Sequence, residues 1–357
     1  MGSDAPKGDL TELLEVVAEG GALTVEQAEA AIDSFMDGSA SEVQMAGLLV
    51  GLRAKGLQPA EVAGGVRALR KAMISVASAD ADRLVDTAGT GGGVVTTFNI
   101  STASALVVAG AGVPVAKHGN RSFTSRCGSA DVLEALGVRI ELTPAQMATV
   151  LAEAGIVFMF APLLHPAMRH VGPVRRGLGV ATMMNILGPL TNPAGARRQV
   201  VGVADPRLLD LVPGALLELG HLHALVVHGE PGLDEVSPFG ITRVAELKEG
   251  RIERYEISPA ELGLESHSLG ALSGGSLSGG SLAGGDPSEN AALIERILVG
   301  QPGAARDAVV ANAAAALLVG DAAASWSEAA RLAEATLDRG GAGEALERLR
   351  TASREAR

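Results

Sequence analysis

Glycines and short polar side chains are concentrated in one stretch of this sequence, Asp86 to Gly137. Glycines let a backbone take positive φ and leave room for a ligand beside the main chain. When such a loop precedes a helix N-terminus that carries Ser and Thr, the exposed amides form a site for phosphate. The first part of the stretch has this composition, with Gly89, Gly91, Gly92 and Gly93 followed by Asn99, Ser101 and Thr102.

A second anion-binding loop is predicted shortly downstream. A strand-like run, Val113–Ala116, leads into the cationic segment from Lys117 to Arg121, and a Gly/Ser loop from Ser125 to Ser129 opens a further helix. Two such loops with cations between them suggest a ligand with two phosphorylated ends. The spacing matches neither a P-loop nor the GxGxxG pattern. A glycine-rich turn can also be no more than a tight connection.

Two adjacent acids, Asp234 and Glu235, lie in a Gly/Pro-containing loop after the apolar run Ala224–Val227. Magnesium prefers hard oxygen ligands and takes few from the protein when substrate phosphates and water supply the rest. Adjacent acids are also an ordinary feature of solvated surfaces. The pair alone therefore does not predict a metal site.

The elements that position these residues change in character along the chain. Residues 8–78 are predicted to form successive helices, with a capping box at Thr24 and Gln27. Further helices are expected over Ala40–Ala54 and Pro59–Met73. Small residues dominate these helices, which favours close helix packing and a subunit interface.

From residue 83 onward, short apolar runs alternate with helical patterns, which is typical of a mainly parallel sheet covered by helices. The expected strands include Val113–Val115, Ile156–Phe160, Val200–Ala204 and Ala224–Val227. One helix is bounded by Thr143, Pro144 and Gly155. Residues 241–258 are predicted to form a hairpin that turns at 248–250. The low-complexity segment 267–286 is expected to be a surface loop, and the tail from Trp326 is expected to be an amphipathic helix pair.

Composition excludes several classes of protein. The 357 residues are 47% hydrophobic, which is typical of a globular chain with room for two domains. A net charge of −12 and 2% aromatic residues argue against nucleic-acid binding. One cysteine fits a reducing compartment. We see neither a signal peptide nor a membrane span, so we expect a soluble cytoplasmic protein without a membrane partner.

Several short motifs occur in a distinctive order: GTGG, then NIST ten residues on, then KHGNR and GSADVLEALG. Together they resemble the signature segments of anthranilate phosphoribosyltransferases. The resemblance extends from about residue 10 to 350, apart from the Gly/Ser insert. It implies a small α-helical domain (1–78 with 167–192) and a larger α/β domain (79–166 with 193–357) with a mainly parallel sheet. It also implies an active site at the hinge and a homodimer formed through the helical part.

The resemblance also implies the substrates, phosphoribosyl pyrophosphate and anthranilate, and the product of their transfer, N-(5-phosphoribosyl)anthranilate, in tryptophan biosynthesis. Backbone amides, hydroxyls and lysine are the groups that phosphate oxygens require. The positions that match the family's donor-binding residues are Gly89, Gly92, Gly93, Thr97, Asn99, Ser101, Thr102, Lys117, Asn120, Arg121, Thr124, Ser125 and Ser129. Ser101 and Thr102 are alternatively helix caps.

On the acceptor side, an aromatic acid needs a cation for its carboxylate, and Arg offers two parallel hydrogen bonds. Arg175 matches the family's anthranilate-carboxylate residue, and the other acceptor positions implied are Gly89, Asn120, His165 and Gly188. Ser101, Asp234 and Glu235 match its Mg²⁺ ligands. His118 and His165 are candidates to orient a group or relay a proton, but packed polar histidines explain them equally well. No catalytic group is assigned with certainty, and Cys127 is expected to be a neutral filler.

One departure from the family pattern matters. The family usually has GTGGD, whereas this chain has GTGGG, with Gly93 in place of the acid. An acid there would lie beside the pyrophosphate and its metal. We therefore expect altered magnesium dependence or donor affinity rather than loss of catalysis. The segment SFTSRCG also departs from the family's Ser/Lys-rich version.

Two other functions fit the same architecture. A pyrimidine-nucleoside phosphorylase is one, although KHGNR and the Asp-Glu pair suit it less well. A non-enzymatic paralogue of the family is the other. Gly93 favours it, whereas the presence of Lys117, Arg175 and the acid pair argues against it.

Overall fold

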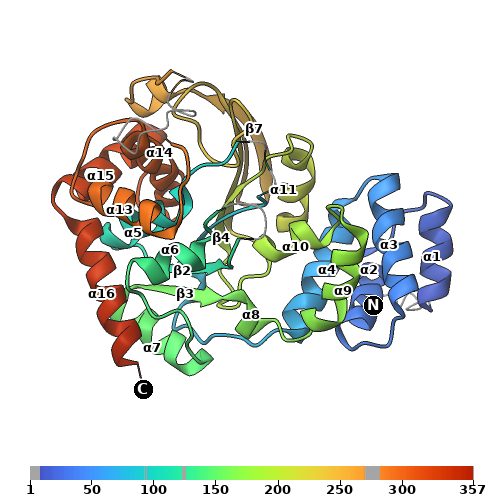
Figure 1. Cartoon of the computed structure of the whole chain (residues 1–357). Helices are drawn as coiled ribbons and strands as arrows, with labels where there is room; N and C mark the ends of the chain where they lie inside the picture. Colours follow the sequence, from blue (N-terminus) through green and yellow to red (C-terminus); the bar gives the residue numbers. More distant parts are fainter. Residues whose placement is uncertain are drawn as a thin grey trace.

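The computed structural model describes residues 9–91, 93, 95–122, 126–268, 270 and 282–356. The predicted positions Gly92, Thr124 and Ser125, and most of the Gly/Ser segment 267–286, lie outside these residues. A small helical part and a larger α/β part lie side by side (Figure 1). None of the described helices is long and apolar enough to cross a membrane.

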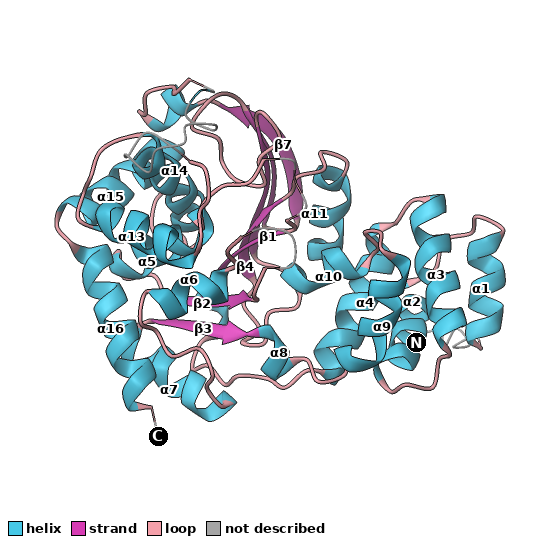
Figure 2. Ribbon diagram, in the orientation of Figure 1, coloured by secondary structure: helices cyan, strands magenta, loops and turns pink. Residues whose placement is uncertain are grey.

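The helical part is formed by the first helices of the chain and by later helices that return to it (Figure 2). They are α1 (Leu10–Ala18), α2 (Val25–Met36), α3 (Glu42–Lys55), α4 (Pro59–Ala72), α9 (Met168–Leu178) and α10 (Met184–Leu190). The predicted capping box of Thr24 and Gln27 is present. The expectation that α3 begins at Ala40 was two residues early, because Ser41 is the N-cap and forms its own capping box with Gln44.

The α/β part is built on a seven-stranded sheet of order β3-β2-β1-β4-β5-β6-β7. The first five strands in this order are parallel, and the hairpin β6–β7 adds two antiparallel strands at one edge. The strands are β1 (Val85–Gly89), β2 (Val115–Gly119), β3 (Ile156–Phe160), β4 (Arg198–Gly202), β5 (His223–Gly229), β6 (Thr242–Lys248) and β7 (Arg251–Ile257). The predicted hairpin and its turn are confirmed.

Two predicted strands were misplaced along the chain. The expectation that Lys117 follows a strand ending at Ala116 was wrong, because β2 continues through Lys117 and His118 to Gly119. The strand expected at Val200–Ala204 lies two residues earlier, over Arg198–Gly202. In both cases a polar end of the strand is paired in the sheet, so the apolar run alone did not mark its bounds.

Helices cover both faces of the sheet. Those of the α/β part are α5 (Ile100–Gly110), α6 (Ser129–Ala135), α7 (Pro144–Ala154), α8 (Ala161–Leu164), α11 (Leu208–Glu218), α13 (Pro287–Leu298), α14 (Ala304–Val319), α15 (Trp326–Asp338) and α16 (Gly341–Glu355). Two short 3-10 helices, η1 (Ala81–Arg83) and η2 (Pro259–Leu262), join elements. The predicted helix at 144–154 and the C-terminal helix pair are confirmed.

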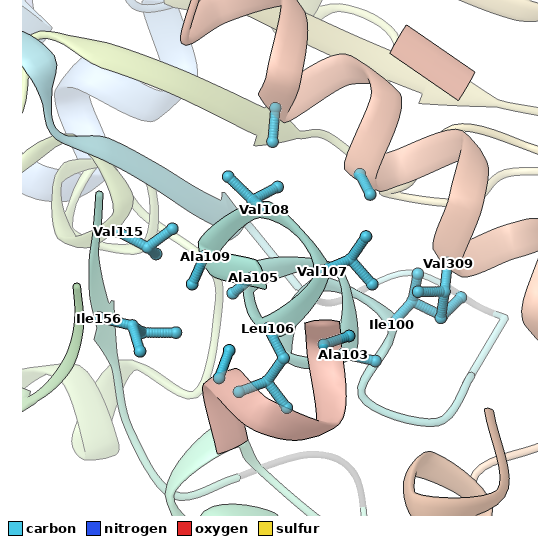
Figure 3. Packing of buried hydrophobic residues seen from close by; sticks show 14 of the residues in the cluster. Ile100, Ala103, Ala105, Leu106, Val107, Val108, Ala109, Val115, Ile156 and Val309 are labelled. Atoms are coloured by element: carbon cyan, nitrogen blue, oxygen red, sulfur yellow. The ribbon is translucent and has the colours of Figure 1, made fainter. Parts of the chain in front are cut away.

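The two faces of the sheet belong to two hydrophobic cores, because side chains alternate along a strand. Val200, Leu225 and Val227 join the core that contains α5 and α14. The alternate residues Val201 and Val226 join the core of α4, α11 and the helical part. Apolar residues of α5, from Ile100 to Ala109, pack near Val115 and Val309 (Figure 3). The second core thus continues from one sheet face into the helical part.

Close packing in the helical part depends on glycine at several contacts, of which the one at Gly64 is the tightest. A Cβ added at Gly64 of α4 would lie 2.3 Å from the Val25 carbonyl oxygen of α2. We predict that Gly64→Ala lowers the free energy of unfolding by about 1–3 kcal/mol, since backbone must move. Gly343→Ala in α16, where the new methyl would meet nothing within 4 Å, should be neutral or stabilise by up to about 1 kcal/mol. Urea denaturation of both variants tests this, and equal stability of Gly64→Ala and wild type would contradict it.

Candidate active site

A cavity of about 1240 Å³ lies at the carboxyl ends of the parallel strands. Ligands of open α/β sheets bind at this edge, where the strand order reverses. Residues of β1, β2, α9, α10 and α11 line it together with the loops after β4 and β5. The cavity therefore lies where the helical part meets the sheet.

The structure brings most of the predicted site residues to this cavity. Those that line it are Gly89, Gly93, Asn99, Ser101, Thr102, Lys117, His118, Asn120, Arg121, Ser129, Arg175, Gly188, Asp234 and Glu235. Of the predicted residues that the structure describes, two do not line it. Thr97 forms an isolated β-bridge with Ala283, and His165 lies against His118.

The N-terminus of α5 faces the cavity with its hydroxyls free of capping bonds. The N-cap residue is Asn99, so the alternative that Ser101 and Thr102 serve as caps finds no support. Ser101 Oγ accepts a hydrogen bond from Lys117 Nζ at 3.2 Å. Thr102 Oγ1 is buried and has no hydrogen-bond partner among the described residues. A buried hydroxyl in this situation at a helix N-terminus is suited to a phosphate oxygen.

Lys117 is the cation at the centre of the site. Its side chain is only 4% exposed, and Nζ donates to the Thr87 carbonyl oxygen at 2.6 Å. Burial lowers the pKa of this ammonium group, and the charges of Asp86 and Glu235 oppose that shift. Lys117 is therefore a fixed, poorly hydrated group, whose charged form a phosphate would stabilise well.

The second loop is held by side-chain hydrogen bonds to its backbone. Asp131 Oδ2 accepts from the Gly128 amide at 2.8 Å and from the Ser122 amide at 3.3 Å. Ser129 Oγ donates to the Asn120 carbonyl oxygen at 3.2 Å. These bonds tie both ends of the segment from Asn120 to Ser129 to each other beside β2.

Two residues of this region differ in their availability to a ligand. Arg121 is paired with Asp131 and Glu134 of α6, so its charge is already compensated. Burial raises the pKa of the Cys127 thiol to about 11, which fits the expected neutral filler rather than a reactive thiolate. Lys117 is therefore better placed than Arg121 to supply positive charge to the donor region.

The predicted acid pair lies against the first glycine loop. Asp234 Oδ2 accepts a hydrogen bond from the Gly91 amide at 3.1 Å. A Cβ added at Gly89 would lie 2.6 Å from the same oxygen, so only glycine admits this approach. Desolvation in the cavity, with the neighbouring Asp234 charge, raises the pKa of Glu235 to about 8. Two half-buried acids with raised pKa values form a site that favours a bound cation.

Sequence reasoning missed the residues that support this acid pair. Asn312 of α14 accepts from the Val236 amide at 2.8 Å and donates to its carbonyl oxygen at 3.0 Å. Asn290 donates to Asn99 Oδ1 at 3.0 Å and so joins α13 to the first loop. Each is a single Asn in a helix, at least 76 residues away in the chain from its partner, so no local sequence pattern marks it.

Arg175 of α9 lines the cavity on the side of the helical part. Among the described residues, its guanidinium group has no hydrogen-bond or ion-pair partner, and burial lowers its pKa. Gly188 lies on the same wall, with open space where a side chain would be. A half-buried guanidinium in this state suits a ligand carboxylate.

His118 and His165 face each other, with their Nε2 atoms 3.2 Å apart. Burial lowers the pKa of His118 to about 3 and that of His165 to about 4, so both rings are neutral at pH 7. The ring N–H of His118 donates to the Gly188 carbonyl. Between two neutral rings one Nε2 donates and the other accepts, and the tautomers of the rings decide which.

The comparisons with known proteins agree with this architecture. The helical bundle domain of a glycosyl transferase family matches residues 11–73, and the a/b domain of such a family matches residues 81–343. The fold and the cavity are thus those of a glycosyl transferase built from these two domains.

The relatives define the family more narrowly. The chain is 47% identical over 348 residues to the anthranilate phosphoribosyltransferase of Rhizobium meliloti, covering 98% of this chain and 99% of that one. It is 48% identical over 346 residues to that of Rubrobacter xylanophilus, covering 97% and 98%. The crystal structure of the Thermus thermophilus enzyme superposes with a TM-score of 0.88 at 43% identity, covering 96% and 99%. The chain belongs to the anthranilate phosphoribosyltransferase family.

The raised pKa of Glu235 makes stability depend on pH. The folded protein holds a proton on Glu235 up to about pH 8, whereas the unfolded chain releases it near 4.5. Folding therefore takes up a proton between these values, and stability falls as the pH rises through that window. We predict that Glu235→Gln removes this fall and raises the melting temperature at pH 8–9 in the absence of metal.

Glu246→Gln is the matched control for this prediction. Hydrogen bonds from His223 and Tyr255 hold the pKa of Glu246 below its ordinary value, so its charged form stabilises the fold at neutral pH. The control should lower the melting temperature at pH 8–9. Thermal unfolding from pH 5.5 to 9 compares them, and identical profiles for Glu235→Gln and wild type would contradict the prediction.

Proposed function

We propose that this protein transfers the phosphoribosyl group from phosphoribosyl pyrophosphate to the amino group of anthranilate. The products are N-(5-phosphoribosyl)anthranilate and pyrophosphate, in a step of tryptophan biosynthesis. One observation carries the proposal. A phosphate-type loop, a buried lysine and an acid pair line the same cavity as Arg175, which no described residue neutralises. A structure of the Saccharomyces cerevisiae anthranilate phosphoribosyltransferase, 26% identical with a TM-score of 0.83, is described in complex with PRPP and Mg.

On this proposal the donor lies between the two loops. Backbone amides near Gly91 and the hydroxyls of Ser101 and Thr102 bind one phosphorylated end, with Lys117 beneath them. The second loop, with Asn120 and Ser129, binds the other end. Holding both ends fixes C1 of the ribose in the cavity, and such positioning is a main source of rate acceleration.

Asp234, Glu235 and Ser101 are the residues proposed to hold Mg²⁺. The residues fit, because two acids with raised pKa values and a hydroxyl offer the hard oxygens that this ion prefers. Bound magnesium supplies positive charge that stabilises the pyrophosphate as it leaves. Asn312 keeps the acid pair in place through its two hydrogen bonds to the backbone of the next residue, Val236.

Arg175 is proposed to bind the anthranilate carboxylate, with Asn120, Gly188, Gly89 and His165 nearby in the acceptor region. The bond between C1 and the pyrophosphate oxygen breaks, and its electron pair leaves with the pyrophosphate. The amino nitrogen of anthranilate forms a bond to C1 and then loses a proton to water. An arylamine needs no strong base for this step, which agrees with the low pKa values of the two imidazoles beside the cavity.

An assay of anthranilate fluorescence tests the function. Fluorescence should fall only when phosphoribosyl pyrophosphate and Mg²⁺ are both present. Phosphate-dependent cleavage of a pyrimidine nucleoside would instead support the phosphorylase alternative. Absence of both activities in a protein that is folded would support a non-enzymatic paralogue.

The role of Arg175 can be separated from general surface charge. We predict that Arg175→Ala raises KM for anthranilate at least tenfold, because a charge-assisted hydrogen bond is worth about 1.5–3 kcal/mol. KM for the donor should change little. Arg176→Ala is the matched control, since Arg176 is exposed and does not line the cavity. Steady-state kinetics in both substrates decide, and equal effects of the two substitutions would refute the assignment.

Gly93 faces Ala204 and Gly232 across the cavity wall. A Cβ added there would lie 3.1 Å from the Ala204 methyl and 3.4 Å from the Gly232 carbonyl oxygen, so an Asp side chain fits after a small shift. We predict that Gly93→Asp changes the magnesium dependence or the donor KM, because it adds an anion beside the acid pair. The activities of the wild type and of Gly93→Asp are measured as the concentrations of donor and of Mg²⁺ are varied. Superimposable curves would refute the prediction.

A homodimer through the helical part and a cytoplasmic location are proposed with the function. The exposed surface of α3 carries Val43, 81% exposed, and Val50, 43% exposed, which a second subunit would cover. We predict a sedimentation mass of two chains, and a one-chain mass at assay concentrations would exclude the dimer. The division into residues 1–78 with 167–192 and the remainder is likewise a proposal. The separate matches to residues 11–73 and 81–343 support the boundary near residue 78. The packing of Val171, Val174 and Leu187 in the core of the helical part supports the assignment of 167–192.

A further inference from the structure

The strands β1 and β2 separate from each other toward the cavity. They pair at one position, Val85 with Val115. By contrast, β1 pairs with β4 over five positions, and β2 pairs with β3 over five. In a regular parallel ladder the pairing would continue to the strand ends. Here both strand ends instead line the cavity, with Thr87 to Gly89 on one side and Lys117 to Gly119 on the other.

Side chains take the place of the missing backbone bonds in this gap. The His118 amide of β2 donates to Asp86 Oδ1 of β1 at 3.3 Å. The Thr87 carbonyl oxygen of β1 accepts from Lys117 Nζ of β2 at 2.6 Å. The Ala116 carbonyl oxygen of β2 accepts from Asn192 Nδ2 at 2.8 Å. Each bond satisfies a buried backbone group that the opened ladder has left without its usual partner.

Asp86 and Asn192 form the core of this arrangement. Both are fully buried, at 0% and 1% exposure. Asn192 Nδ2 also donates to Asp86 Oδ2 at 2.7 Å, and Gln199 Nε2 donates to the same oxygen at 3.2 Å. Burial raises the pKa of the Asp86 carboxyl, whereas the Lys117 charge and these three N–H donors oppose the shift. Three donors and no acceptor are the pattern expected around an ionised carboxylate.

We infer that Asp86 and Asn192 are positioning residues that hold β1 and β2 apart, so that the ammonium group of Lys117 lies between the strands and faces the donor. The inference rests on the proposed function and adds residues that act on the donor through Lys117. Neither Asp86 nor Asn192 lines the cavity. The carboxylate of Asp86 also balances the buried charge of Lys117, and Asn192 is fixed in turn because its Oδ1 accepts from the Ala194 amide.

The first test is Asp86→Asn. The amide would place an NH₂ group against the donors of one of the two oxygens and remove the negative charge that supports Lys117. We expect phosphoribosyl pyrophosphate to bind about 10- to 100-fold more weakly by calorimetry, the range that a buried hydrogen bond to a charged group corresponds to. KM for anthranilate should stay within about threefold of wild type, because the acceptor wall is not touched.

The rescue variant is the exchanged pair, Asp86→Asn combined with Asn192→Asp. It is compared with Asn192→Asp alone. The single change at position 192 places two carboxylates together and should also weaken donor binding. In the exchanged pair, the new amide at position 86 can donate to the new carboxylate at position 192, and one negative charge remains near Lys117. Recovery of donor affinity by about tenfold or more over the single variants would show that the two positions are coupled.

Glu246→Gln is the control for lost stability, because Glu246 is a hydrogen-bonded carboxylate of the same sheet away from the cavity. A purely structural role for Asp86 would reduce the folded fraction and leave donor affinity per folded molecule unchanged. That outcome, or wild-type donor affinity in Asp86→Asn, would overturn the inference. Should Asp86→Asn fail to fold, Asn192→Ser, which keeps the carboxylate, is measured in the same way.

Donor binding by the wild-type protein distinguishes failure of the proposed function from failure of the positioning role. Absence of donor binding by the wild type would mean that the proposed function itself has failed. Donor binding by the wild type with equal binding by all variants would leave that function standing and reject the positioning role.

Discussion

The hydrogen bond from the Gly91 amide to Asp234 Oδ2 joins two segments that are 143 residues apart in the chain. It brings a loop suited to phosphate against a carboxylate suited to a cation. The approach requires glycine at two places. A Cβ at Gly89 would meet the carboxylate, and one at Gly202 would lie 1.6 Å from the Asp234 backbone oxygen. Groups suited to an anion and groups suited to a cation can share one cavity because this contact fixes their relative position.

The rest of the fold serves to keep such groups partly out of water. Alternating side chains give the sheet two apolar faces, and each face belongs to its own core. The cavity opens where these cores end and the helical part begins. The charged groups of Lys117 and Arg175 are largely withdrawn from water there. A charge in this situation is stabilised best by a ligand of opposite sign, which is why the site is suited to a phosphorylated and carboxylated pair of substrates.

Much of this could be predicted from the sequence, because local patterns carry it. Capping residues marked the helices at Thr24 and Thr143, and the apolar run Ile156–Phe160 marked β3 to the residue. The glycine loop and Lys117 were found by residue type and order, and the acid pair by its match to the family, and the structure places them around one cavity. The ends of β2 and β4 were missed, because their last or first residues are polar and pair only through the sheet.

The residues that support the site could not be found in the sequence. Asn312 and Asn192 form hydrogen bonds to backbone atoms of distant segments, and Asn290 donates to the side chain of the distant Asn99. Such bonds leave no periodic pattern in the sequence. Asp86 begins the glycine-rich stretch that the sequence analysis singled out, but its partners could not be predicted. Gln199 lies beside it only through the pairing of β1 with β4, and Asn192 reaches it only where the chain returns from the helical part. Thr97 was assigned to the donor by resemblance alone, and the structure shows it in a β-bridge with Ala283.

The outermost strand of the sheet has a consequence for assembly. β7 is one of the two edge strands of the sheet, and its exposed residues include Arg251, Glu253 and Arg254. Alternating charges on an edge strand discourage another chain from adding to the sheet, because each would have to lose its hydration. The charged residues of the hairpin therefore disfavour the addition of a further strand at this edge of the sheet.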